Sequence, residues 1–199
     1  MRKILLLLTI FTVGSLSAQG NGDFVSFQFV KTTPGEQYNV ILNEKWKELH
    51  QMRIDEGTIT GWDTWWRVGA TPESDWNLLI VTVAKHPDSL NANVGVQKMR
   101  PDYSEMDREI FLEKNYKART LVWQNVYVNK GLNFAGNNGE TPAVPQVAVM
   151  NPMKTNYTND AKYEALENSL NSGDLGSRIG WGLLKRIDNY GDDIHHNYM

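Results

Sequence analysis

The fold is decided by two stretches of sequence, FVSFQFVK at residues 24–31 and WNLLIVTVAK at residues 76–85. The first alternates and is rich in aromatic and β-branched residues, which is typical of a β-strand. The second is an almost continuous apolar run, as found in strands that are covered on both faces. We therefore expect two strands, of which the second lies in the interior of a sheet.

A helix and a further strand are predicted between these two stretches. Thr33 is expected to cap the helix, with Pro34 in the first turn and Glu36 completing a capping box. Gly57 is expected to end it. An apolar stripe at helical spacing is formed by Tyr38, Ile41, Leu42, Leu49 and Met52. The next stretch, TITGWDTWWRV at residues 58–68, predicts the second strand.

Later segments complete a recognisable order of elements. Residues 102–117 predict a second helix, and LVWQNVYV at residues 121–128 predicts a fourth strand. The partial apolar stripe of this helix consists of Met106, Ile110, Phe111 and Tyr116. The order strand, helix, strand, strand, helix, strand, with right-handed crossovers, predicts a ferredoxin-like α+β domain over residues 19–130.

The pattern starts again after a Gly-, Asn- and Pro-rich stretch at residues 131–145, which is expected to be a linker. A strand is predicted at residues 147–154 and a short helix at residues 160–170, and Gly180-Trp181 parallels Gly61-Trp62. Residues 146–199 are therefore interpreted as a partial second ferredoxin-like copy that stops midway through its third strand. The alternative is one irregular α+β domain with a C-terminal extension.

The N-terminal residues 1–18, MRKILLLLTIFTVGSLSA, have the pattern of a secretory signal peptide. Two basic residues precede a short apolar run, and small residues surround the expected cleavage point between Ala18 and Gln19. The run is too short to span a bilayer, and no later segment is apolar enough to do so. We expect a secreted or periplasmic protein without a membrane span after cleavage of the signal.

The composition excludes several classes of function. The 199 residues include no cysteine, which excludes a disulfide scaffold, a thiolate metal site and a cysteine nucleophile. The formal net charge of −3 does not indicate the basic surface that nucleic-acid-binding proteins have. Glycine-rich phosphate loops and the motifs of serine hydrolases and zinc peptidases are missing from the sequence.

The chain resembles the dimeric α+β-barrel superfamily, which includes NIPSNAP-like and antibiotic-biosynthesis-monooxygenase-like proteins. The resemblance depends on FVSFQFVKTTPG, on the helix with Trp46 and His50, and on GTITGWDTWWRV and LLIVTVAK. In that superfamily two ferredoxin-like units pair their sheets, which implies a homodimer or an intrachain pseudo-dimer. Members include cofactor-free oxygenases, haem enzymes and proteins of no known activity, so the fold alone does not assign a function. We expect no cofactor here.

His50 is the candidate catalytic residue, because it lies one helical turn after Trp46 and its ordinary pKa is near neutrality. It is interpreted either as a general base or as a boundary histidine that packs on Trp46. Candidate ligand-binding residues share an aromatic or polar character near the second strand: Tyr38, Trp46, Trp62, Asp63, Trp65, Trp66 and Arg67. The tryptophans could equally form core, and Asp63 could pair with Arg67.

The leading hypothesis is a small apolar ligand in a Trp-lined cavity, with a cofactor-free, oxygenase-like activity through His50. The alternative is an extracellular carbohydrate- or protein-interaction module with exposed tryptophan platforms. The run DDIHH at residues 192–196 offers metal-ligand types, but neighbouring histidines on a strand point apart, so no metal site is predicted. A haem would need His50 or His86 as its axial ligand, and neither lies in a diagnostic motif.

Overall fold

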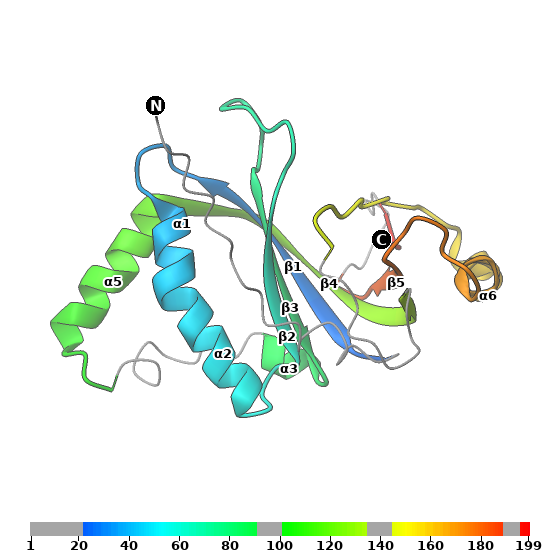
Figure 1. Ribbon diagram of the computed structural model, residues 1–199, viewed down its shortest axis with the longest axis horizontal. Helices are drawn as coiled ribbons and strands as arrows, with labels where there is room; N and C mark the ends of the chain where they lie inside the picture. Colours follow the sequence, from blue (N-terminus) through cyan, green and yellow to red (C-terminus); the bar gives the residue numbers. More distant parts are fainter. Residues whose placement is uncertain (1–21, 91–100, 135–144, 189–195) are drawn as a thin grey trace.

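Five antiparallel strands form one sheet in the order β2-β3-β1-β4-β5 (Figure 1). The computed structural model describes residues 22–90, 101–134, 145–188 and 196–199, so the expected signal peptide lies outside the described residues. The strands are β1 (Phe24–Thr32), β2 (Gly61–Trp66), β3 (Leu78–Ala84), β4 (Arg119–Phe134) and β5 (Gly180–Arg186).

The first four strands have the ferredoxin-like arrangement. β1 and β3 are central and antiparallel, with Phe24 opposite Ala84 and Val30 opposite Leu78. β2 flanks β3, β4 flanks β1, and helices follow β1 and β3 along the chain. Figure 1 shows α1, α2 and α5 together on one side of the sheet and α6 at the other end of the molecule. This order of strands and helices confirms the predicted α+β, ferredoxin-like fold class.

The helical segment after β1 has three parts: α1 (Tyr38–Ile41), a π-helical turn (Leu42–Trp46) and α2 (Lys47–Asp55). π-turns are rare and often occur at functional sites. In a regular α-helix of about 3.6 residues per turn, Tyr38 and His50 would point about 120° apart. The wider turn rotates the chain less per residue, so both side chains face the same side of the helix.

The predicted start of this segment is wrong, whereas its predicted end is confirmed. The Thr33 amide donates to the carbonyl of Ala118 at 2.9 Å, so Thr33 continues the pairing of β1 instead of capping a helix. Gln37 precedes the helix in a left-handed conformation, with φ of 49° and no side-chain cap. Gly57 follows the helix with φ of 72°, a conformation that favours glycine.

The helix α5 (Glu105–Ala118) confirms the second predicted helix and begins at a capping box. The Asp107 amide donates to Ser104 Oγ at 3.2 Å, and the Ser104 amide donates to Asp107 Oδ2 at 3.0 Å. Its expected apolar stripe is wrong, because only Phe111 of those four residues is buried and Tyr116 is 71% exposed. The helix buries Asn115 and Ala118 instead. α3 (Pro87–Leu90) is a short helix directly after β3.

β4 is longer than predicted and continues through residues 131–134, which were expected to begin a linker. The rest of that linker, up to residue 144, lies outside the described residues. The second half of β4 pairs with β5 in the same sheet, with Phe134 opposite Gly180. At Gly131 a Cβ atom would collide with the Asn168 side chain of α6, so glycine permits the helix to approach the strand.

Some of the elements predicted for residues 146–199 are present. A 3₁₀ turn (Tyr157–Asn159), α6 (Asp160–Asn171) and β5 follow the predicted order. The predicted strand at residues 147–154 is wrong: Val149 is 80% exposed, and one isolated bridge joins Met153 to Tyr198. The amide and the carbonyl of Met199 both bond to Leu184 at 2.9 Å, and an isolated bridge joins Tyr198 to Lys185, so the last residues lie beside β5. The division of the chain into domains stays a prediction.

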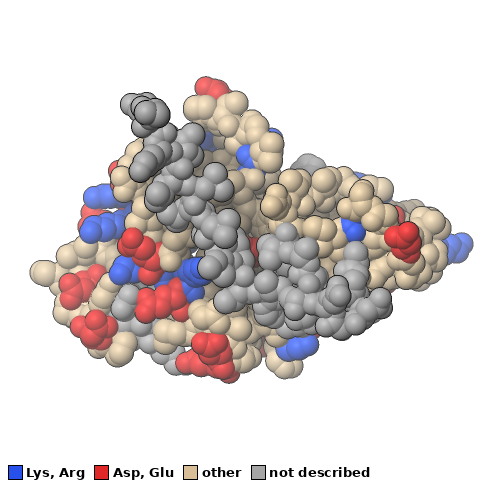
Figure 2. All heavy atoms as spheres, viewed as in Figure 1, with Lys and Arg blue, Asp and Glu red and all other residues tan. Residues whose placement is uncertain are grey.

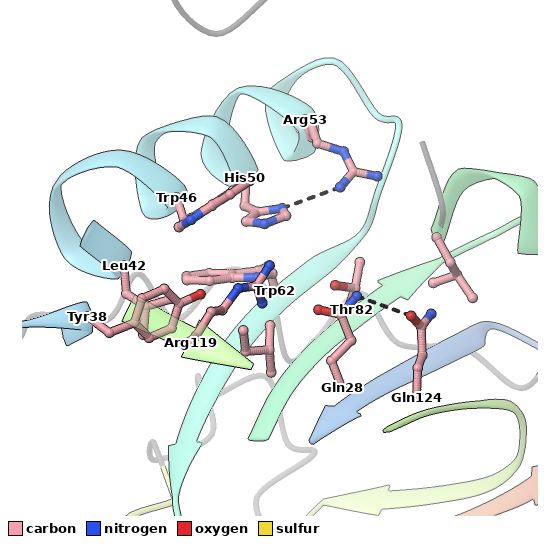
Figure 3. Close-up of a pocket in the computed structure, with 12 residues that line it drawn as sticks. Gln28, Tyr38, Leu42, Trp46, His50, Arg53, Trp62, Thr82, Arg119 and Gln124 are labelled. Carbon is pink, nitrogen blue, oxygen red and sulfur yellow. Dashed lines mark hydrogen bonds between the residues drawn. The ribbon is translucent and has the colours of Figure 1, made fainter. Parts of the chain in front are cut away.

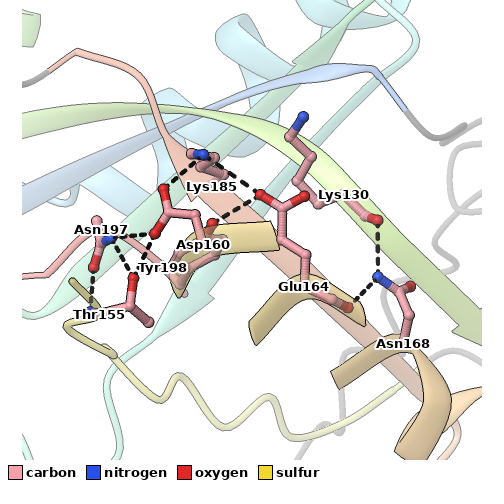
Figure 4. Close-up of polar contacts among 8 residues, drawn as sticks. All are labelled: Lys130, Thr155, Asp160, Glu164, Asn168, Lys185, Asn197 and Tyr198. Atoms are coloured by element: carbon pink, nitrogen blue, oxygen red, sulfur yellow. Dashed lines mark hydrogen bonds and ion pairs between the residues drawn. The ribbon is translucent and has the colours of Figure 1, made fainter. Parts of the chain in front are cut away.

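Polar contacts connect α6 and the segment before it to β5 and to the last residues of the chain (Figure 4). Lys185 Nζ lies 2.8 Å from Asp160 and 3.5 Å from Glu164. The Tyr198 hydroxyl donates to Glu164 Oε1 at 2.7 Å, and Asn197 donates to Thr155 Oγ1 at 2.7 Å. The Lys185 ammonium and the Thr155 hydroxyl stabilise the charged form of Asp160, and its pKa is lowered although burial opposes the shift.

Both faces of the central strands are covered. One core cluster contains Phe27, Phe29 and Tyr127, and Leu184 and Met199 pack against it. A second cluster lies under the helices. Coverage on both faces is what the apolar run of β3 predicts. Within the described ranges, no helix has the length and apolar content needed to cross a bilayer.

Candidate functional site

A cavity of about 380 Å³ lies between the helical segment after β1 and the sheet (Figure 3). The helical segment contributes Tyr38, Leu42, Trp46, His50 and Arg53. The strands contribute Gln28, Trp62, Ile80, Thr82, Arg119 and Gln124, and Leu90 of α3 completes the lining. The structure therefore brings the candidate catalytic residue His50 together with Tyr38, Trp46 and Trp62 of the predicted ligand-binding residues.

Three aromatic rings form one wall of this pocket. The His50 ring stacks on Trp62 with centroids 4.6 Å apart and an angle of 14° between the planes. Trp46 lies 6.0 Å from His50, and its indole Nε1 donates to Asn115 Oδ1 at 2.9 Å. Asn115 is buried on α5, so the second helix fixes the orientation of Trp46. The stacking on Trp62 and the hydrogen bond to Asn115 therefore fix the orientation of these rings.

His50 is a neutral ring in this environment. Burial, together with the positive charges of Arg53 and Arg119, lowers its pKa to about 3. Arg53 Nη1 lies 3.4 Å from His50 Nδ1 (Figure 3), and because arginine can only donate, Nδ1 is the acceptor. The ring proton is therefore assigned to Nε2. A group with such a low pKa is a weak base at neutral pH, which argues against the general-base role considered for His50.

Three buried polar atoms of the pocket residues have no hydrogen-bond partner among the described residues. They are the Tyr38 hydroxyl, the Trp62 indole Nε1 and the Arg53 Nε. Burial raises the pKa of Tyr38 to about 12, although Arg119 opposes the shift, so the phenol stays protonated. An unsatisfied buried donor costs stability, and most buried polar groups in proteins find partners. These donors are available to a ligand.

The described residues that line the pocket carry positive charge and include no carboxylate. Arg53 is anchored, since its Nη2 donates to the Ser89 carbonyl at 2.6 Å. Arg119 lies over the rings of Tyr38 and Trp46, with its Cζ 5.6 Å and 6.0 Å from the ring centroids. Figure 3 shows the Tyr38 hydroxyl and the Arg119 side chain turned toward the same space beneath His50.

The other predicted ligand-binding residues lie outside this pocket. Trp65 packs against the core cluster on the opposite face of the sheet. Asp63 accepts a hydrogen bond from the Thr64 amide at 2.7 Å, and no ion pair joins Asp63 to Arg67 among the described residues. Arg67 instead lies over Trp76, with its Cζ 4.9 Å from the ring centroid.

Trp66 does not line the pocket either, because it is 53% exposed near the end of β2. Trp66 shares a strand face with Trp62, since side chains alternate, but it is not among the described residues that line the cavity. Its role in ligand binding stays a prediction.

The candidate metal and haem ligands are not gathered at any site that the structure describes. Residues 189–195 lie outside the described ranges. His196 is described, and its Nε2 lies 2.9 Å from the Tyr127 hydroxyl. His86 is exposed just after β3 and lies away from the pocket. Within the described residues no cluster of three metal-ligating side chains exists.

Sequence reasoning missed Gln28, Arg53, Thr82, Arg119 and Gln124. A signal was present in β1, where Ser26 and Gln28 are polar at every second position of a strand at the centre of the sheet. Gln124 Nε2 donates to Ser26 Oγ at 2.9 Å, and Gln28 Nε2 donates to Gln124 Oε1 at 3.3 Å. A central strand with a polar inner face points to a cavity instead of a dry core.

Comparison with known proteins adds little to this description. No protein-family model matches the chain, and no curated protein matches it. The solved structures that are similar include a dimeric ferredoxin-like protein of unknown function from Thermobifida fusca. It is 11% identical, with a TM-score of 0.31, and the similarity covers 54% of this chain and 92% of that chain. The fold class therefore depends on the strand order observed here.

Proposed function

We propose that this protein binds a small organic molecule in the pocket beneath His50. The observation that carries the proposal is the group of buried donors on Tyr38, Trp62 and Arg53 that have no partner among the described residues. A pocket of about 380 Å³ in which aromatic rings face several convergent polar side chains lies in the size range of small-molecule sites. A bound ligand would supply the missing acceptors.

Binding is proposed ahead of catalysis. An oxygenase-like reaction that depends on proton removal would need a base that is effective near neutral pH. The lowered pKa of His50 makes that ring a weak base, and the lining residues include no aspartate or glutamate. His50 is better suited to packing on Trp62 and to donating a hydrogen bond from Nε2.

Export and self-association are also proposed. Residues 1–18 support secretion or a periplasmic location, because they have the pattern of a signal peptide. A homodimer or an intrachain pseudo-dimer is proposed from the superfamily resemblance, and the packing of Leu184 and Met199 on the far face of the sheet favours the intrachain form.

Native mass spectrometry of gently purified protein tests the binding proposal. We expect a small-molecule adduct on the wild-type protein and its loss in Thr82→Phe, because the larger ring would occupy the pocket. Trp66→Ala is the control, since Trp66 lies outside the pocket, and it should keep the adduct. Thermal melting of each variant verifies folding. An adduct that persists in Thr82→Phe would place the ligand elsewhere and reject the proposal.

The exposed Trp66 is the one observation that favours the alternative, a carbohydrate- or protein-interaction surface. The same variants separate the two functions. A platform function predicts that Trp66→Ala abolishes binding and that Thr82→Phe does not. The buried donors of the pocket have no role in that alternative, which is why the pocket is preferred.

A further inference from the structure

We infer that the occupant of the pocket is a small organic carboxylate, whose charged group is held by Arg119 together with the Tyr38 hydroxyl. This inference rests on the proposed function and specifies the ligand class. It depends on three observations. The charged side chains inside the pocket are positive, the Arg119 guanidinium has no polar partner among the described residues, and the groups beside Arg119 are hydrogen-bond donors.

The charge inside the pocket differs from the charge outside. Figure 2 shows acidic and basic side chains intermingled over the helical part of the surface that it draws. Inside, Arg53 and Arg119 are the charged lining residues, and both are positive. The His50 ring adds no charge. Since a buried charge is costly unless it is paired, an anion is the expected partner of this site.

Arg119 is the arginine that is available to a ligand. The guanidinium of Arg53 is committed to the Ser89 carbonyl and to His50 Nδ1. The Arg119 guanidinium has contacts with the faces of the Tyr38 and Trp46 rings, but this side chain has no hydrogen bond or ion pair with any described residue. Its planar fork of N–H groups therefore remains free to bind a carboxylate with two parallel hydrogen bonds.

The groups beside Arg119 are also donors. The Tyr38 hydroxyl and the Trp62 indole N–H are buried and lack partners among the described residues. An indole N–H and a guanidinium can only donate, so a ligand that offers acceptors satisfies all of them. A carboxylate offers two oxygens with about four lone pairs, whereas an amide or an alcohol leaves part of this set unmatched. Leu42 and Ile80 provide apolar contact for the body of the acid.

Isothermal titration calorimetry with matched acid and amide pairs tests the inference. The probes are benzoate with benzamide, phenylacetate with phenylacetamide, and 2-naphthoate with 2-naphthamide. We expect an acid that fits the pocket to bind at least about tenfold more tightly than its amide, because charge-assisted hydrogen bonds are stronger than neutral ones. Arg119→Gln should abolish the preference, and Arg119→Lys should restore part of it.

The control variant is Arg67→Gln, which removes one positive charge on the opposite face of the sheet and should leave the preference unchanged. Equal affinity for acid and amide in the wild-type protein would overturn the carboxylate assignment and leave the binding proposal intact. A preference that survives in Arg119→Gln with an unchanged melting temperature would overturn the role of Arg119. Failure of every probe to bind, together with a wild-type protein that carries no adduct, would overturn the binding proposal itself.

Discussion

Replacing His50 by glutamine should remove much of the acid sensitivity of the folded protein. In the fold the pKa of His50 is lowered to about 3 by burial, by Arg53 and by Arg119. In the unfolded chain a histidine has an ordinary pKa of about 6.5. As the pH falls below about 6.5, the unfolded state therefore binds a proton that the folded state refuses, and the free energy of unfolding decreases.

The size of this effect follows from the two pKa values. Between pH 7 and pH 5 the free energy of unfolding should decrease by about 2 kcal/mol through His50 alone, and by pH 4 the loss should reach about 3 kcal/mol. The stabilisation that is linked to neutral His50 is fully present above the pKa of this histidine in the unfolded chain. Glutamine retains an acceptor for Arg53 but does not titrate, so His50→Gln should lack this part of the pH dependence.

Urea titrations at pH 7 and pH 5, at constant ionic strength, measure the difference. The wild-type protein should lose about 2 kcal/mol more than His50→Gln over this interval. His86→Gln is the matched control, because His86 is exposed, and it should behave as the wild-type protein does. Equal losses in the wild-type protein and His50→Gln would show that His50 titrates normally and would refute the buried, neutral ring.

Four other substitutions test the packing described above, each by urea titration at pH 7. Tyr38→Phe should change the free energy of unfolding by less than about 0.5 kcal/mol, because the hydroxyl that it removes has no described partner, while affinity for the acid probe decreases. Trp62→Ala should cost about 3–5 kcal/mol and Trp66→Ala less than about 1 kcal/mol, and similar losses would contradict the placement of β2. Tyr198→Phe should cost about 1–3 kcal/mol, because it removes the 2.7 Å bond to Glu164, and an unchanged stability would contradict that contact.

The first half of the fold could be predicted because its signals are local. The alternation in β1 and the apolar run of β3 follow directly from the periodicity of strands. The start of the first helix could not be predicted, because the bond between Thr33 and Ala118 joins residues far apart in the sequence. Residues 147–154 have a strand-like composition, but most of them find no partner strand, and pairing decides whether a strand forms.

The pocket was predictable in part for the same reason. Helical spacing places Trp46 and His50 on one face, and both line the cavity. Arg119 could not be found in this way, because it reaches the pocket from the start of β4. Alternation places Trp62 and Trp66 on one face of β2, but it says nothing about how far the helix extends over the strand. Trp66 is therefore exposed although it shares a face with Trp62.

The π-helical turn at Leu42–Trp46 makes the pocket depend on the length of the chain as well as on its composition. Removing one residue there would restore a regular helix in which Tyr38 and His50 still lie within about 20° of each other, whereas removing two would turn Tyr38 about 80° away from His50. In the second case the phenol would leave the space that it shares with Arg119, although every lining side chain would still be encoded. Among natural variants of this chain, a one-residue deletion in this turn should therefore keep the site, and a two-residue deletion should mark proteins that have kept the fold and lost the site.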